Sequence, residues 1–203
     1  SELGQFVLEH KGFNAYWTEY VCSYPDYKKQ GKKIPTNLFE LFVLEKSLLG
    51  RATQERYQIF KKVIQKYFKN GVCFASLPCG LMSDFLLLDC TGIEDFKFIG
   101  LDLDNIALEQ AKANALIMGL QQYCEFYQVD AWKIEFYKKF DLMVSNGLNI
   151  YEQDDNKIIS LYQRFYESLN DTGVLIVSTI TPSPLESNES SWNMNLINQF
   201  LLY

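Results

Sequence analysis

Short apolar runs alternate with helical stretches in this chain, and this alternation limits its possible folds more than any other feature. The sequence predicts five buried strands, which are VCFASL (72–77), FKFIGLD (96–102), CEFYQVD (124–130), FDLMVS (140–145) and VLIVSTI (174–180). Helical spacing lies between them, for example over residues 108–119 and 154–169. Strands without a polar alternate face are typical of a parallel sheet with helices on both sides. The pattern therefore predicts a doubly wound α/β fold.

The N-terminal third of the chain has a different pattern. Residues 1–70 show helical spacing and no clear strand, so we expect a helical extension there. Asn37 and Glu40 resemble a capping box at the start of a helix, and we expect Gly50 to end that helix. A second amphipathic helix is expected over residues 51–68.

A length of 203 residues suits one domain. We expect three parts within it, which are a helical extension or lid (1–70), a cofactor-binding core (71–182) and a C-terminal loop and helix (183–203). The chain begins with Ser1 and ends in the apolar run QFLLY, so we expect a fragment whose C-terminal part is truncated.

Composition excludes several classes of function. The net charge of −6 and the pI of about 4.9 argue against sequence-independent nucleic-acid binding, which needs a basic face. Five scattered cysteines without a C-x-x-C pair, and a single histidine, predict neither a metal site nor a disulfide framework. No apolar stretch is long enough for a membrane span and no signal peptide is visible. A cytoplasmic protein is the expectation.

In a doubly wound sheet, ligands bind beyond the carboxyl ends of the strands. The first strand is followed by Ser76-Leu77-Pro78-Cys79-Gly80, which has one glycine where a dinucleotide fingerprint has three. A dehydrogenase would also need catalytic residues that are absent here, since His10 is remote. The sequence therefore disfavours a pyrophosphate ligand and a dehydrogenase.

The second predicted strand ends at Asp102, 22 positions after Gly80. A carboxylate there can accept hydrogen bonds from both hydroxyls of a ribose. The alternative is a helix cap, but Asp104 or Asn105 can cap the next helix unaided. We therefore expect Asp102 to have no structural role and to bind a ligand.

The third and fourth predicted strands also end in polar residues. Asp130, followed by Ala131, can accept from an exocyclic amine, but taken alone it is better interpreted as an ordinary loop aspartate. The stretch from Ser145 to Tyr151 contains a glycine turn at the expected substrate edge. A turn that leads into a helix is the alternative there.

Together these positions, over about 71–182, resemble a class I S-adenosylmethionine-dependent methyltransferase. The resemblance implies a Rossmann-like sheet of order 3-2-1-4-5 and S-adenosylmethionine as cofactor, without a metal. It implies that the family's usual sixth and seventh strands are missing, which would expose a sheet edge and favour a homodimer. The implied cofactor-binding residues are Ser76, Leu77, Pro78, Cys79, Gly80, Asp102, Leu103, Asp130, Ala131, Ser145, Asn146 and Gly147. The stretch Asp171-Thr172-Gly173 resembles the family's turn before the fifth strand.

Three longer stretches resemble a smaller bacterial group of methyltransferase-like sequences. They are S-x-P-C-G at Ser76–Gly80, S-N-G-L-N-I-Y at Ser145–Tyr151 and N-A-Y-W-T-E-Y at Asn14–Tyr20. Asn146 and Tyr151 are the implied catalytic residues that orient a methyl acceptor. Tyr16 and Trp17 are candidates for a lid, with core packing as the alternative for each.

We expect the acceptor to be a small molecule or a protein side chain. Asn146-Gly147-Leu148 is similar to the N-P-P-Y motif of enzymes that methylate nucleobases, but it lacks both prolines and the chain is acidic. A nucleic-acid substrate is therefore disfavoured.

The loop after the first strand departs from the family pattern. Ser76 stands where the family has an acid, and Pro78 and Met82 replace glycines. A non-catalytic methyltransferase-like domain that binds a nucleoside or a protein partner therefore remains the alternative.

Overall fold

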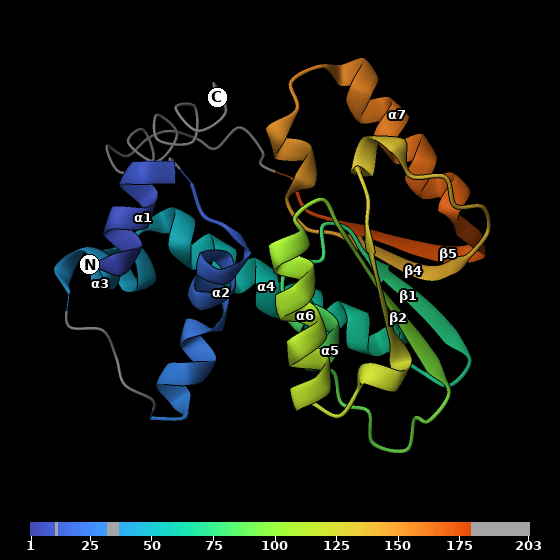
Figure 1. Cartoon of the computed structure of the whole chain (residues 1–203), viewed down its shortest axis with the longest axis horizontal. Coiled ribbons are helices and arrows are strands. Elements are labelled where there is room, and N and C mark those ends of the chain that lie inside the picture. The colour runs from blue at the N-terminus through green and yellow to red at the C-terminus, as the bar shows by residue number, and fades with distance from the viewer. Residues whose placement is uncertain (11, 32–36, 180–203) are drawn as a thin grey trace. The chain divides into compact units, whose positions relative to one another are not determined.

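A five-stranded parallel sheet is the centre of the fold (Figure 1). The computed structural model describes residues 1–10, 12–31 and 37–179. Its strands, in the order β3-β2-β1-β4-β5, are β1 (Val72–Ser76), β2 (Phe96–Asp102), β3 (Cys124–Gln128), β4 (Phe140–Ser145) and β5 (Leu169–Val177). The predicted α/β class and the strand order 3-2-1-4-5 are confirmed.

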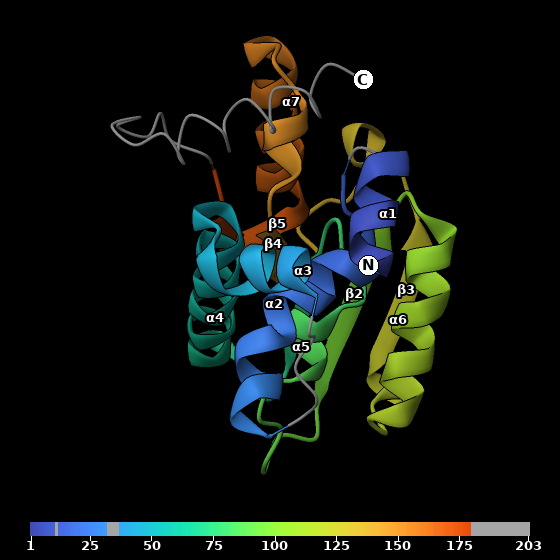
Figure 2. The ribbon, with the colours of Figure 1, turned by 90° about the vertical axis from the view of Figure 1, so that its left-hand side faces the viewer.

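Helices follow the strands as the apolar pattern predicts. They are α5 (Ser83–Leu86), α6 (Asn105–Ile117) and α7 (Asp155–Ser168), with short 3-10 turns at Gln121–Tyr123, Ala131–Lys133 and Leu148–Tyr151. Figure 2 shows α6 beside β2 and β3. Asp104 caps α6, since its Oδ1 accepts from the Ile106 amide at 2.8 Å.

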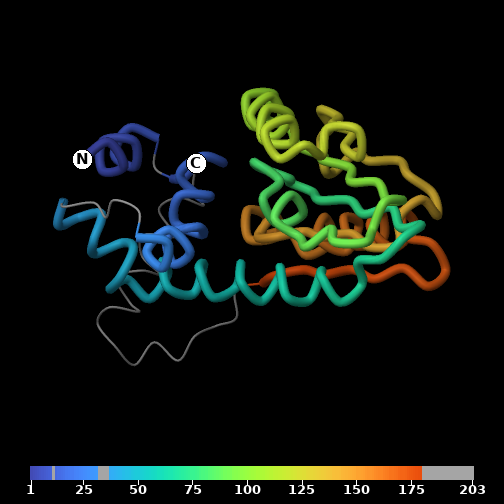
Figure 3. The backbone as a smooth tube through the Cα atoms, turned by 90° about the horizontal axis from the view of Figure 1, so that it is seen from below, coloured from blue at the N-terminus to red at the C-terminus, as the bar shows by residue number. Residues whose placement is uncertain are grey.

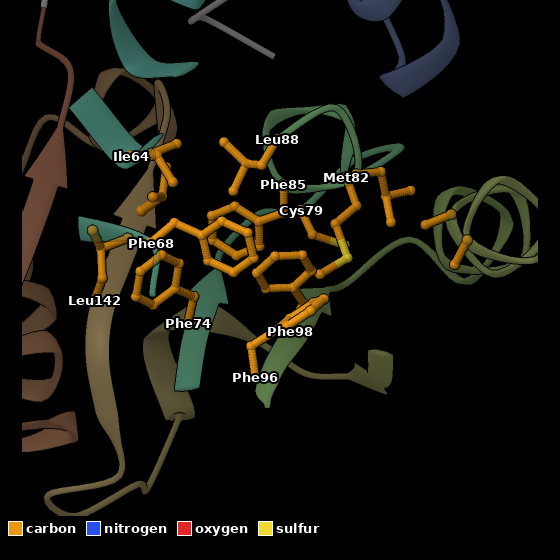
Figure 4. Close-up of a cluster of buried hydrophobic side chains, with 14 of the residues drawn as sticks. Ile64, Phe68, Phe74, Cys79, Met82, Phe85, Leu88, Phe96, Phe98 and Leu142 are labelled. Atoms are coloured by element: carbon orange, nitrogen blue, oxygen red, sulfur yellow. The ribbon is translucent and has the colours of Figure 1, made fainter. Parts of the chain in front are cut away.

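Both faces of the central strands β1, β2 and β4 are buried and apolar, which explains why these strands lack a polar alternate face. One face carries a cluster of aromatic rings, including Phe74, Phe85 and Phe98, shown in Figure 4. The other face packs Ile99 and Met143 against apolar residues of α7. Burial on both sides holds the strands in one register, and that register aligns their carboxyl ends.

The N-terminal part is helical, as predicted. Its elements are α1 (Glu2–His10), α2 (Ala15–Lys29), α3 (Leu38–Leu41), a π-helical turn (Phe42–Lys46) and α4 (Leu48–Tyr67). Residues 1–59 belong to one compact unit and residues 60–179 form another. The tube in Figure 3 shows α4 as one continuous helix, so it contributes to both units.

The predicted part boundaries at residues 70 and 182 stay predictions. Residues 180–203, with the predicted C-terminal loop and helix, lie outside the described residues. Within residues 1–10, 12–31 and 37–179, no helix has the length and apolar character that a membrane span requires.

The prediction that Gly50 ends a helix is wrong. Asn37 caps α3, with Oδ1 accepting from the Phe39 amide at 2.9 Å, but the helical run breaks at Ser47 and Gly50 lies inside α4. A Cβ on Gly50 would lie 2.0 Å from the Val43 carbonyl oxygen. The glycine therefore permits close packing of the π-helical turn on α4.

The predicted turn at 171–173 is also wrong. These residues lie within β5, where the pairing with β4 shifts from Phe140–Leu169 to Leu142–Val174. A Cβ on Gly173 would lie 2.9 Å from the Phe140 carbonyl oxygen, so only a glycine allows this close approach. The turn-forming residues make a bulge in a strand that starts earlier than predicted.

We expect Gly50→Ala to lower the melting temperature, because its Cβ would force the Val43 carbonyl away, at a cost of about 1–3 kcal/mol. Gly4→Ala is the matched control, since a Cβ there meets nothing closer than the flexible Ser1 hydroxyl at 3.3 Å. Thermal unfolding followed by circular dichroism measures both variants. Equal melting temperatures for the two variants would contradict the proposed packing.

Candidate functional site

The carboxyl ends of four strands meet at one edge of the sheet. Ser76, the last residue of β1, is aligned with Gly100 on β2 and Val144 on β4. Asp102, at the end of β2, is aligned with Gln128 on β3. The segments that leave these strands therefore begin side by side, as the sequence predicts for a ligand site.

The loop from Leu77 to Met82 is held by its own backbone. The amides of Leu77 and Cys79 donate to the carbonyls of Val144 and Leu101, each at 2.9 Å, and the Met82 amide donates to the Cys79 carbonyl. The first two bonds tie the loop to β4 on one side and to β2 on the other, and the third closes a turn within the loop. The amides of Leu77 and Cys79 are therefore not available to a ligand.

Asp102 is the centre of the site. Its Oδ2 accepts from the Gly80 amide at 2.9 Å and its Oδ1 accepts from the Asp104 amide at 3.0 Å, while the residue is only 7% exposed. The expectation that Asp102 has no structural role is wrong, since its carboxylate joins the loop after β1 to the end of β2. Each carboxylate oxygen keeps a lone pair, so Asp102 can still accept from a ligand.

Few donors of this loop remain for a ligand. Pro78 has no amide hydrogen, and the Gly80 amide is bonded to Asp102. In the part of the chain that the structure describes, the Leu81 amide is the one amide of the loop without an acceptor. The side chains of Leu77, Cys79 and Met82 are buried, so they support the loop from beneath.

Cys79 packs closely on β2. A Cβ on Gly100 would lie 3.2 Å from the Cys79 Sγ and 2.6 Å from the ring of Phe126. Burial raises the pKa of the Cys79 thiol, and the nearby carboxylates of Asp102 and Asp84 raise it further. Cys79 therefore stays a neutral thiol that fills space, and it is no nucleophile.

A second buried carboxylate lies beneath the loop. Ser76, a predicted ligand residue, is 2% exposed and donates from Oγ to Oδ2 of Asp84 at 3.0 Å. Asp84 comes from α5, eight residues later in the chain. Sequence reasoning missed it because it belongs to no motif, and only the return of the chain at Met82 brings it to Ser76.

Asp130 and Ala131 follow β3 after one intervening residue, Val129. Oδ1 of Asp130 accepts from the Trp132 amide at 3.0 Å, and Oδ2 lies 3.0 Å from the Lys133 ammonium. The hydrogen bond from Lys133, followed by that from Trp132, lowers the pKa of Asp130. Asp130 thus caps a 3-10 turn, and its predicted contact with an adenine stays a prediction. Leu103 extends into solvent beside Asp102 and is 65% exposed.

The segment after β4 begins with a buried Ser145 and continues through Gly147, which has a φ of 87°. The half-buried Asn146 accepts at Oδ1 from the hydroxyl of Ser178 at 3.1 Å. Tyr151 ends the following 3-10 turn and is 67% exposed. Asn146 and Tyr151 therefore lie on one segment, and no hydrogen bond joins them.

The lid candidates lie on α2. The Trp17 ring contacts the rings of Phe6, Tyr16 and Tyr20, with centroids 5.0–6.2 Å apart. Trp17 is thus a packed aromatic of the N-terminal unit, whereas Tyr16 is exposed. Their role as a lid stays a prediction.

The residues that the structure describes contain neither a disulfide nor a cluster of metal-binding side chains. No disulfide joins the five cysteines there, and no group of His, Cys, Asp and Glu side chains could hold a metal ion.

The comparisons with known proteins agree with this geometry. A model of the methyltransferase domain family matches residues 77–200. A crystal structure described as a possible exported protein from Bordetella parapertussis is 31% identical, with a TM-score of 0.88 over 100% of this chain and 70% of that one. No curated protein sequence is significantly similar.

Two more distant structures share the fold alone. A geranyl diphosphate methyltransferase in complex with SAM is 13% identical, with a TM-score of 0.54 over 71% of this chain and 55% of that one. The [4+2]-cyclase SpnF is 15% identical, with a TM-score of 0.54 over 84% of this chain and 61% of that one. This chain thus spans between 55% and 70% of the three structures. The family match covers more than half of the 203 residues, and the chain belongs to the methyltransferase domain family.

Proposed function

We propose that this chain is an S-adenosylmethionine-dependent methyltransferase whose cofactor binds at the carboxyl edge of β1, β2 and β3. The observation that carries the proposal is the bond from the Gly80 amide to the buried carboxylate of Asp102. This bond brings the loop after β1 to the acid after β2. The SAM complex of the geranyl diphosphate methyltransferase, a protein of the same fold, supports the choice of cofactor.

The residues at this edge fit a nucleoside. Asp102 retains lone pairs for ribose hydroxyls. The exposed Leu103 side chain beside it offers an apolar surface for a flat base. Ala131, also a predicted contact of the base, is only 7% exposed and belongs to the apolar core. Asp130 would accept from an exocyclic amine, and the Leu81 amide would donate to a carboxylate.

A bound sulfonium cofactor supplies an activated methyl group, so the protein needs to align the acceptor and exclude water. We assign the alignment to the Asn146 amide and to the exposed Tyr151 hydroxyl, both on the segment after β4. A general base is optional, because its need depends on the nucleophile. Tyr16 and Trp17 remain candidates for a lid.

The proposed acceptor is a small molecule or a protein side chain. Asp104, Glu152, Asp154 and Asp155 lie on the segments that follow β2 and β4. These carboxylates would repel a phosphate backbone, which disfavours a nucleic acid.

We also propose a homodimer through the outer strand β5, because its apolar residues Val174–Ile176 are only half-buried.

We also propose a cytoplasmic location, because no disulfide joins the five cysteines, all of which the structure describes, and a reducing compartment keeps disulfides from forming. The similar Bordetella parapertussis protein is described as a possible exported protein. Fractionation of cells with an antibody against the chain separates these two locations.

A non-catalytic methyltransferase-like domain is the second candidate. The observation that favours it is the loop after β1, where the amides of Leu77, Cys79, Gly80 and Met82 are already bonded. The shared fold of the [4+2]-cyclase also shows that this architecture does not determine the reaction. Transfer of a radiolabelled methyl group to any acceptor would exclude the non-catalytic candidate.

We expect Leu103→Ala to raise the Kd for S-adenosylhomocysteine about 3- to 10-fold, since the lost apolar contact is worth ~1 kcal/mol. The exposed side chain contributes little to folding, so stability should not change. Isothermal titration calorimetry measures the Kd, and Ile117→Ala, at an even more exposed apolar residue at the far end of α6, is the control. Equal affinities of both variants would refute the contact between Leu103 and the base.

We expect Asp102→Ala to weaken S-adenosylhomocysteine binding by about 1–3 kcal/mol and to lower the melting temperature, because it removes an acceptor from two amides and from the ribose. The matched control is Asp141→Ala at the amino end of β4. Asp141 also accepts two hydrogen bonds, from the Cys73 amide at 2.7 Å and from the Asn170 side chain.

The control should lose stability and keep its affinity. The same calorimetric titration, paired with thermal unfolding, separates the two effects. An unchanged Kd in folded Asp102→Ala would show that the ribose does not bind there, whatever happens to stability.

A further inference from the structure

Ser178 connects the ends of β4 and β5. Parallel pairing aligns Ser145 with Val177, and the next amide, that of Ser178, donates to the Ser145 carbonyl at 3.2 Å. The pairing therefore continues one residue beyond β5. This continuation brings the Ser178 hydroxyl to Oδ1 of Asn146, 3.1 Å away. Ser145 and Ser178 are both buried, at 3% and 9% exposed.

The hydrogen bond from Ser178 orients the side-chain amide of Asn146. A side-chain amide has an acceptor end, Oδ1, and a donor end, Nδ2. Because Oδ1 faces the Ser178 hydroxyl, Nδ2 points away from it. Among residues 1–10, 12–31 and 37–179, none accepts from Nδ2. Asn146 is half-buried, so this donor remains accessible at the carboxyl edge.

We propose that Ser178 is a positioning residue that holds Asn146 with its Nδ2 hydrogens directed at the methyl acceptor. The inference rests on the proposed function in one respect, namely that Asn146 meets the acceptor. It also names a chemical class. The part of the acceptor molecule that meets Asn146 carries an oxygen lone pair, as in a carboxylate or a carbonyl group, and is no alkylammonium group.

The test is a ¹H–¹⁵N spectrum of the side-chain amides of the full chain. Comparison with Asn146→Asp identifies the Asn146 pair of resonances, because that variant lacks the Nδ2 hydrogens. We expect Ser178→Ala to shift this pair toward the position of a free asparagine amide, and Ser178→Thr to restore it. Ser168→Ala is the matched control, since that buried serine donates to the Arg164 carbonyl within α7.

Should Ser178→Ala not fold, Ser178→Cys replaces it, because a thiol keeps the shape and is a weaker donor. An intermediate shift of the Asn146 pair is then expected. An Asn146 pair that is unchanged in Ser178→Ala or Ser178→Cys, or that moves as far in Ser168→Ala, overturns the positioning role.

The chemical class is tested in the same spectrum, with S-adenosylhomocysteine at saturation. We expect sodium acetate to shift the Asn146 pair and methylammonium chloride at the same ionic strength to leave it in place. No shift with acetate, or a shift with methylammonium, overturns the oxygen assignment. If S-adenosylhomocysteine moves neither the Gly80 nor the Leu103 backbone amide, the proposed function fails, while the effect of Ser178→Ala still decides the positioning role.

Discussion

The hydrogen bond between the Gly80 amide and the Asp102 carboxylate is the contact on which the candidate site depends. It is charge-assisted and partly buried, so it is stronger than an ordinary hydrogen bond and costly to break. It stabilises a loop that has one glycine where a dinucleotide-binding fingerprint has three. The amides of Leu77 and Cys79 bind to the neighbouring strands, so the first half of the loop is held before any ligand arrives. A rigid loop lowers the entropic cost of binding.

The packing beneath the loop depends on small residues at the right places. Gly100 leaves room for the Cys79 thiol, and Ser76 reaches the Asp84 carboxylate without a bulky side chain between them. On the opposite side of β1, the Ser178 hydroxyl orients Asn146. The edge of the sheet thus has an acceptor-rich half at Asp102 and a donor at Asn146. These two halves correspond to a nucleoside and to an oxygen-bearing acceptor in the proposed function.

Much of the fold could be predicted from the sequence, because burial of a parallel sheet on both faces leaves apolar strands that are recognisable without a structure. The Asp104 cap and the alignment of the strand ends at one edge could be predicted in the same way, from residues next to each predicted strand or helix. Asp84 and Ser178 could not be found this way, since their partners are eight and 32 residues away. Gly50 and Gly173 resemble helix and turn ends, but close approaches to the carbonyls of Val43 and Phe140 explain them better. Local patterns cannot reveal such contacts.

The most direct test of the central claim is a crystal structure of this chain with S-adenosylhomocysteine. We expect the ribose hydroxyls within hydrogen-bond distance of the Asp102 carboxylate, the adenine against Leu103, and the bond from the Gly80 amide still in place. A ribose bound elsewhere, or an Asp102 side chain that turns away from both the loop and the ligand, would contradict the account.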